Sequence, residues 1–197
     1  MQHEFLNLLA ARKGHFRYES SYHSDLWLDL DRLFLRPRAV QPFAMELAKI
    51  LTPYNVTAVC GSLVGGAFLA QMVAAELDVE FFYTERFVRP QQEGLYPIAY
   101  RLPDGLHQAI RGKDIAILDD VISAGSAVRG TLTDLRAYGI GSVVVGALLV
   151  LGDSAPKFFA KQNIPLVYVA EHASNLWLPS DCPLCAAQVP LEDLSHG

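Results

Sequence analysis

The stretch Ile115-Ala-Ile-Leu-Asp-Asp-Val-Ile-Ser-Ala-Gly-Ser-Ala-Val-Arg129 decides the fold class of this chain. Its first four residues form a short apolar run that is typical of a buried parallel strand. Two adjacent carboxylates, Asp119 and Asp120, end that run, and a loop of small residues follows at 123–127. Apolar residues then recur at helical spacing over 128–135. This order of strand, acidic pair, loop and helix predicts a ligand site at a helix N-terminus.

The loop of small residues predicts a site for an anion. Backbone N–H groups and the positive end of the helix dipole face an anion that is bound at a helix N-terminus. Small side chains let the backbone approach the anion, and glycine accepts a positive φ. Serine hydroxyls add further donors. The residues that we assign to this anion site are Ser123, Ala124, Gly125, Ser126 and Ala127.

The acidic pair narrows the choice of ligand. Asp119 and Asp120 would repel a bare phosphate, but carboxylates accept hydrogen bonds from hydroxyl groups and bind metal ions. A sugar phosphate with a vicinal diol therefore suits both halves of the motif. The alternative is an ordinary strand-to-helix turn, in which the two acids are solvated and Ser123 and Ser126 cap the helix.

The rest of the chain repeats the alternation of strand and helix from residue 56 onward. Such alternation predicts an α/β fold with a parallel sheet that helices cover on both faces. Ligands of such sheets bind at the carboxyl ends of the strands, where the turn that begins with Gly61 and Ser62 also opens. The expected strands are 56–60, 79–83, 115–118, 142–151 and 166–169, and the expected helices are 67–77, 124–138 and 157–162.

Three further segments have patterns of their own. Residues 16–30 alternate aromatic and polar groups, which favours a small hairpin, and a helix is expected from Pro37 to Pro53. Residues 86–111 are rich in proline, glycine and glutamine and form a long excursion between two strands. A loop of that length in a compact domain is usually functional or disordered.

Length and composition exclude several classes of protein. A chain of 197 residues is predicted to form a single domain, 1–197, and half of its residues are hydrophobic. The net charge of −5 argues against a nucleic-acid partner. Residues 1–9 resemble a short amphipathic helix rather than a signal peptide, and no apolar run is long enough to span a membrane. We therefore expect a cytoplasmic protein without a membrane partner.

The three cysteines allow several interpretations. Cys60 ends an apolar run and is expected to be a buried small hydrophobe. Cys182 and Cys185 form a C-x-x-C pair, which supplies half of a zinc site. His172 or His196 would have to complete such a site, at a spacing that fits no standard pattern, unless a dimer pools two pairs. A redox-active pair and an incidental pair are the alternatives.

The stretch 119–129 closely resembles the phosphoribosyl pyrophosphate (PRPP) motif of type I phosphoribosyltransferases, and its Ser-Ala-Gly-Ser-Ala-Val-Arg portion is most like that of orotate phosphoribosyltransferases. The resemblance implies a Rossmann-like parallel-sheet core with a hood, formed here by 1–36 and 171–197. It also implies that Asp119 and Asp120 hold the ribose hydroxyls of PRPP and that the loop cradles its 5-phosphate.

Other segments carry weaker resemblances to the same family. Gly14-His15-Phe16, Ser20 and His23-Ser24 resemble part of the hood over the base, where we expect both histidines to be structural. The turn at Gly61 and Ser62 resembles the pyrophosphate loop.

The excursion lies where the family has a mobile catalytic loop that reaches into a partner subunit. The resemblance thus implies a homodimer and catalytic roles for Arg86, Arg89 and Asp120. It implies magnesium as the cofactor, carried by the pyrophosphate rather than by protein ligands.

The implied reaction joins a nitrogenous base to the ribose 5-phosphate of PRPP and releases pyrophosphate. Orotate is the first choice of base, which would make the protein an enzyme of pyrimidine biosynthesis. A purine or another pyrimidine is the alternative within the enzyme class. A non-enzymatic regulator that binds PRPP is the alternative outside it.

The chain departs from the family pattern where the family has cations. Glu19 and Gly65 stand where lysines are typical, and 152–154 (Gly-Asp-Ser) replaces the arginine that contacts the orotate carboxylate. Another cation must then meet that carboxylate if orotate is the base. Candidates near the hood in the sequence are Arg17, Arg32, Arg36 and Arg38.

Overall fold

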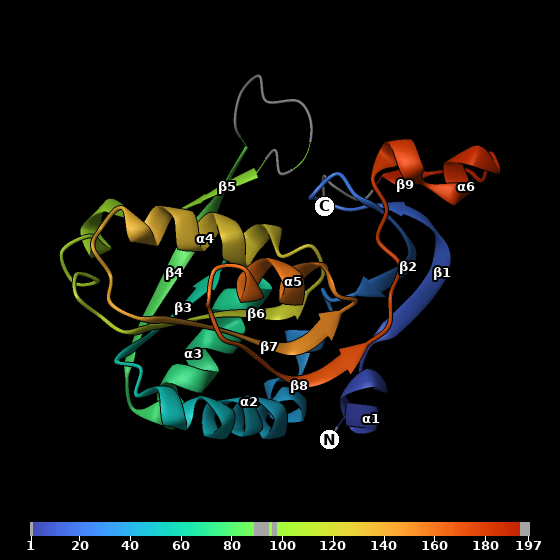
Figure 1. Ribbon diagram of the computed structural model, residues 1–197. Coiled ribbons are helices and arrows are strands. Elements are labelled where there is room, and N and C mark those ends of the chain that lie inside the picture. Colours follow the sequence, from blue (N-terminus) through green and yellow to red (C-terminus); the bar gives the residue numbers. More distant parts are fainter. Residues whose placement is uncertain (1, 89–94, 96–97, 194–197) are drawn as a thin grey trace.

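The computed structural model describes residues 2–88, 95 and 98–193 of the chain (Figure 1). The helices are α1 (Gln2–Leu6), α2 (Pro37–Leu51), α3 (Gly65–Leu77), α4 (Ser126–Arg136), α5 (Ser154–Ala160) and α6 (Pro183–Ala186). The strands are β1 (Ala10–Arg17), β2 (His23–Asp29), β3 (Ala58–Ser62), β4 (Glu80–Val88), β5 (Ile98–Arg101), β6 (Ile115–Ile122), β7 (Val143–Leu151), β8 (Leu166–His172) and β9 (Glu192–Asp193).

A six-stranded sheet forms the centre of the fold, with the order β5-β4-β3-β6-β7-β8. The five strands from β4 to β8 in that order pair in parallel, and β5 joins the β4 edge antiparallel. The predicted α/β class with a mostly parallel sheet is therefore confirmed. The reversed order around β3 and β6 places the carboxyl ends of these two strands side by side, which is where such sheets bind ligands.

Both faces of the sheet are buried under helices, as the apolar strands predicted (Figure 1). Successive residues of β6 point to opposite faces. Ala116 and Leu118 pack in a core with α2 and α3, whereas Ile115 and Ile117 pack in a second core with α4 and α5. The alternation holds β6 rigidly between two layers, so the residues at its carboxyl end have fixed positions.

A second, smaller sheet joins the two ends of the chain. Its order is β2-β1-β9, with β1 and β2 forming an antiparallel hairpin and β9 pairing parallel to β1. His23 also forms a bridge with Trp177, just before the C-terminal segment. The hairpin expected in 16–30 thus exists, but it begins earlier, at Ala10. This sheet and α6 lie beside the carboxyl ends of the central strands (Figure 1).

Two sequence predictions need correction. The strand expected over 115–118 continues to Ile122, so Asp119 and Asp120 lie within β6 rather than after it. Val121 and Ile122 extend the strand because their apolar side chains remain paired with β7. The excursion begins as an extension of β4 and returns as β5, an antiparallel pair rather than an irregular loop. Its tip, 89–94 and 96–97, lies outside the described residues, and so does Arg89.

The expectation for Cys60 can be compared with the structure. Cys60 is completely buried in β3, as expected for a small hydrophobe. Among the described residues, no helix combines the length and the apolar character needed to cross a bilayer.

Gly61 sits where β3 and the start of α3 touch. A Cβ atom built on Gly61 would lie 2.1 Å from the carbonyl oxygen of Gly66 and 2.7 Å from the Cα of Ala67. Because these are backbone atoms, no side-chain rotation relieves the clash. The glycine is therefore required for the close approach of strand and helix, whatever it contributes to a ligand.

We predict that Gly61→Ala lowers the free energy of unfolding by about 1–3 kcal/mol, the usual cost of overpacking. Chemical denaturation measures this loss. Gly105→Ala is the matched control, because a Cβ at Gly105 meets no atom within 4 Å. Equal stability of the two variants would contradict the packing role of Gly61.

Candidate ligand-binding site

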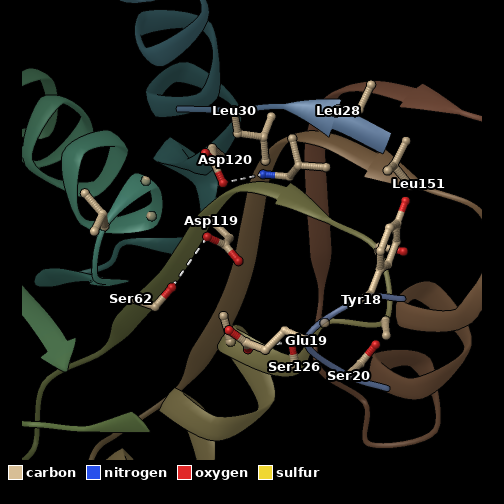
Figure 2. Close-up of a pocket in the computed structure, with 18 of the residues that line it drawn as sticks. Tyr18, Glu19, Ser20, Leu28, Leu30, Ser62, Asp119, Asp120, Ser126 and Leu151 are labelled. Carbon is tan, nitrogen blue, oxygen red and sulfur yellow. Dashed lines mark hydrogen bonds between the residues drawn. The ribbon is translucent and has the colours of Figure 1, made fainter. Parts of the chain in front are cut away.

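A cavity of about 740 Å³ opens at the carboxyl ends of β3 and β6 (Figure 2). Its floor is made by the β3–α3 turn, 62–66, and by the end of β6 with the following loop, 119–127. Its wall is the β1–β2 hairpin, which brings 18–20 and 27–31 to the same space. The volume is within the range of small-molecule sites. The turn and the loop that the sequence nominated separately thus line one cavity.

The acidic pair lies at the centre of this cavity. Asp119 is half-buried and Asp120 is buried. The Ser62 hydroxyl donates to Oδ1 of Asp119 at 3.5 Å, and Oδ1 of Asp120 accepts the backbone N–H of Val121 at 2.8 Å (Figure 2). A carboxylate has about four lone-pair sites, so each acid keeps acceptor capacity for a ligand beyond these hydrogen bonds.

Two glycines at the start of α3 make room for these carboxylates. A Cβ on Gly65 would lie 2.3 Å from Oδ2 of Asp120, and one on Gly66 would lie 2.7 Å from Oδ1 of Asp119. A side chain at either position would therefore displace a carboxylate. This explains why the lysine typical of the resembling family cannot occupy position 65 while Asp120 keeps this orientation.

Burial raises the pKa values of both acids. Desolvation raises the pKa of Asp120 to about 6. The pKa of Asp119 is raised well above its usual value, first by desolvation and then by the charges of Asp120 and Glu19. Two carboxylates in a partly desolvated site resist ionising together. Hydroxyl donors or a cation from a ligand would stabilise their charged forms.

The loop 123–127 leaves a helix N-terminus open to the cavity. Gly125 has φ of 77° and is the residue before the first turn of α4. No side chain caps this end, so the alternative in which Ser123 or Ser126 acts as an ordinary cap is wrong. The N–H groups at the start of α4 therefore face a cavity that contains all five predicted loop residues.

Glu19 approaches this open helix end from the hairpin (Figure 2). Its Oε1 accepts hydrogen bonds from Ser126 Oγ at 3.2 Å and from the Tyr100 hydroxyl at 2.8 Å. Its Oε2 forms an ion pair with Nε of Arg86 at 3.0 Å. Burial and the Glu19 charge raise the pKa of Tyr100, which stays a donor. Glu19 thus places a negative group where an anion would bind.

The hairpin supplies the opposite wall of the cavity. Arg12 and Trp27 are cross-strand neighbours on β1 and β2, and both line the cavity together with Tyr18. Ser20 lines it too, and its buried Oγ has no hydrogen-bond partner among the described residues. A buried hydroxyl without a partner is costly, so Ser20 is ready to bond a ligand. No motif or spacing in the sequence pointed to Arg12.

Several residues that the sequence nominated do not line this cavity. The four arginines proposed as substitutes for the lost cations, at 17, 32, 36 and 38, are not among its lining residues. Two further polar residues of the 86–111 excursion are also absent from the lining. Arg101 lies over the ring of Phe87, and His107 stacks on Tyr138 with ring centroids 4.1 Å apart. Arg86, in contrast, does line the cavity.

Comparison with known proteins gives matches over nearly the whole chain. The orotate phosphoribosyltransferase of Thermotoga maritima is 29% identical over 183 residues, which cover 93% of this chain and 90% of that protein. The crystal structure of orotate phosphoribosyltransferase from Aeropyrum pernix matches with a TM-score of 0.60 and 25% identity, over 82% of this chain and 88% of that one.

Adenine phosphoribosyltransferase from Trypanosoma brucei shares the fold, with a TM-score of 0.64 at 16% identity, over 86% of this chain and 78% of that one. No protein-family model matches the chain. The resemblance to type I phosphoribosyltransferases, and to orotate phosphoribosyltransferases in particular, is confirmed by these matches.

The raised pKa of Asp120 predicts that burial of this carboxylate lowers the free energy of unfolding in a pH-dependent way. In the unfolded chain an aspartate titrates near ~3.9, whereas in the folded protein Asp120 titrates at about 6. Its contribution to stability is therefore present below about pH 4 and is lost as pH rises through 6. Asp120→Asn should have no such loss.

We predict that Asp120→Asn gains stability relative to the unmutated protein between pH 4 and 7, by up to about 3 kcal/mol. Chemical denaturation at several pH values measures the difference. Asp181→Asn, which changes an exposed carboxylate, should show none. A difference for Asp120→Asn that does not change with pH would contradict the burial cost.

Proposed function

We propose that this chain, whose sequence and fold resemble those of orotate phosphoribosyltransferases, transfers the phosphoribosyl group of PRPP to a nitrogenous base and releases pyrophosphate. One observation carries the proposal: a single cavity contains a buried acidic pair and an uncapped helix N-terminus. These are the acceptor and donor groups that a ribose phosphate requires. The similarity to enzymes of this type over nearly the whole chain supports the proposal.

The two ends of the ribose phosphate would meet different groups. In our proposal Asp119 and Asp120 accept the two ribose hydroxyls, and the backbone N–H groups of 123–127 bind the 5-phosphate with the hydroxyls of Ser123 and Ser126. The phosphate must displace Glu19 from Ser126, because a carboxylate and a phosphate repel each other. Arg86, the present ion-pair partner of Glu19, also lines the cavity, and in our proposal it then turns toward the incoming anions.

The pyrophosphate would lie over the turn that contains Gly61 and Ser62. Arg86 borders the same cavity and is our candidate for the cation that meets it; Arg89 stays a candidate from the sequence alone. The two partly desolvated carboxylates and the phosphates of PRPP form a donor set of hard oxygens, which fits magnesium. Magnesium would supply neutralisation of charge on the leaving pyrophosphate.

The protein itself has few chemical tasks in this reaction. It must hold the base nitrogen and the anomeric carbon within reach. It must also stabilise the leaving group with fixed charges and exclude water that would compete with the base. The described lining residues include no cysteine and no histidine that would activate a serine, which is consistent with a reaction without a covalent intermediate. The hairpin residues Tyr18, Ser20 and Trp27 would enclose the base.

Orotate is our first choice of base, and Arg12 is the feature that supports it. The orotate carboxylate needs a cationic partner once it leaves water. Arg12 lines the cavity from β1 and forms an exposed ion pair with Glu192 at 3.1 Å, which it could exchange for a ligand carboxylate. Arg12 therefore replaces, from a different strand, the arginine that 152–154 lacks.

A neutral base is the second candidate. It is favoured by the acids Asp29, Asp31 and Asp193, which border the same cavity and would oppose a carboxylate. A regulator that binds PRPP without turnover is the third possibility. Pyrophosphate release from PRPP and magnesium with orotate, uracil, adenine, guanine or hypoxanthine separates the three.

The homodimer and the cytoplasmic location stay predictions from the sequence. A homodimer would bring the excursion of one subunit, which begins at Arg86, to the site of the other. With orotate as the base, the reaction belongs to pyrimidine biosynthesis, as it does in the named relatives.

We predict that the double variant Asp119→Asn, Asp120→Asn weakens PRPP binding at least tenfold, about 1.4 kcal/mol, and abolishes pyrophosphate release. Titration calorimetry with PRPP and magnesium measures the affinity. Asp104→Asn controls for the change of a carboxylate on the surface. An unchanged affinity in the folded double variant would refute the assignment of the acidic pair.

We also predict that Arg12→Gln lowers kcat/KM for orotate at least tenfold and leaves the value for a neutral base within about twofold. Arg17→Gln is the matched control, because Arg17 forms an equivalent exposed pair with Asp193 from the same strand without lining the cavity. If Arg12→Gln and Arg17→Gln behave alike toward orotate, Arg12 does not bind its carboxylate.

A further inference from the structure

Two histidines and two cysteines meet outside the cavity just described. His15 comes from β1 and His23 from β2, on the two sides of the turn that carries Glu19, while Cys182 and Cys185 come from the start of α6. One ligand atom of each residue lies within 4.8 Å of all the others. His15, His23 and Cys182 are buried, and Cys185 is exposed. The C-x-x-C pair therefore has two histidines beside it.

The spacing of these four atoms matches the edges of a metal-centred tetrahedron. Zinc bonds of ~2.0–2.1 Å to nitrogen and ~2.3 Å to sulfur give edges of about 3.4 Å between nitrogens and about 3.6 Å between nitrogen and sulfur. Nε2 of His15 lies 3.1 Å from Nδ1 of His23, 3.4 Å from Sγ of Cys182 and 3.7 Å from Sγ of Cys185. Sγ of Cys185 lies 3.3 Å from Nδ1 of His23.

The surroundings of His15 fix the nitrogen that faces the cluster. Its Nδ1 lies 2.8 Å from the backbone carbonyl oxygen of Val189, to which it can only donate. In the neutral ring, Nε2 is then unprotonated and points at the other three atoms. Zinc-binding histidines commonly have this arrangement, in which the second ring nitrogen donates to a carbonyl that orients the ring.

We propose that His15, His23, Cys182 and Cys185 bind one zinc ion per chain. The set of two thiolates and two imidazoles with tetrahedral spacing is typical of zinc. Because the protein supplies all four ligands, the site is closed and structural rather than catalytic. His172 and His196, the partners that the sequence offered for the cysteine pair, are not needed; His196 lies outside the described residues.

The position of this site would let the metal ion link two segments that are distant in sequence. The ion would join the C-terminal segment to the turn end of the β1–β2 hairpin, and the turn itself carries Tyr18, Glu19 and Ser20 into the ligand cavity. Up to Asp193, where the described part of the chain ends, β1 and β9 have two paired positions, Phe16 with Glu192 and Arg17 with Asp193. A metal crosslink would hold this short contact in register. The proposal does not depend on which ligand the cavity binds.

The first test measures metal content and coordination. The full chain is purified without chelators or a metal-affinity tag, and its zinc is counted by elemental mass spectrometry. We expect about one zinc per chain. Replacement by cobalt should then give the thiolate charge-transfer band and the visible bands of tetrahedral cobalt. Less than a tenth of an equivalent, both as purified and after incubation with zinc and a reductant, would overturn the proposal.

Substitution of each proposed ligand tests whether that residue binds the zinc ion. Cys182→Ser, Cys185→Ser, His15→Ala and His23→Ala should each lose most of the bound metal. The matched controls are Cys60→Ala, which removes a buried thiol elsewhere in the fold, and His172→Ala, and both should keep the metal. Retention of zinc by all four ligand variants would refute the assignment.

A redox pair is the main alternative, and intact mass under non-reducing conditions addresses it. A Cys182–Cys185 disulfide that persists in the presence of zinc and reductant would overturn the metal site. If a ligand variant fails to fold, the unmutated protein is treated with a chelator instead. Removal of zinc should lower the melting temperature of the protein and expose the segment after residue 172 to protease, and adding zinc back should reverse both effects.

Discussion

The rest of the site depends on the burial of two adjacent carboxylates at the end of β6. Desolvation raises the pKa values of Asp119 and Asp120, so keeping both carboxylates charged in the fold lowers its stability. Gly65 and Gly66 leave space for them, because any Cβ there would touch a carboxylate oxygen. The packing of α3 against β3 through Gly61 brings that glycine turn to the acids. Such a cost is common where function requires an arrangement that stability alone would not select.

The same cavity contains the uncapped N-terminus of α4, which carries partial positive charge. The carboxylate of Glu19 lies at this helix end, where it contacts Ser126 and Arg86. Glu19 has the opposite charge to the lysine that is typical of the resembling family, and these contacts explain how its carboxylate is held. Glu19 satisfies the donors that a phosphate would otherwise meet, so ligand binding in our proposal is an exchange of one anion for another.

The hairpin that carries Glu19 is held in place from the other end of the chain. β9 pairs with β1, and Trp177 pairs with His23. The proposed zinc site adds a third connection at the turn end of the hairpin, with one ligand on the strand that carries Arg12. The wall of the cavity is therefore built from segments about 170 residues apart in sequence, and its position depends on long-range contacts between the two ends of the chain.

The sequence by itself determined the α/β class, the mostly parallel sheet and the acidic pair with its loop, because these follow from local periodicity and from short motifs. It also located Arg86. Tertiary structure alone decided which cations reach the cavity: Arg12 does, whereas Arg17 on the same strand does not. A break in the register between Lys13 and Phe16 interrupts the regular alternation of β1 between the two arginines. Tertiary structure likewise decided that His15 and His23 accompany the two cysteines. Contacts across the whole length of the chain leave no mark in local spacing, since they arise only when the two ends pair in one sheet.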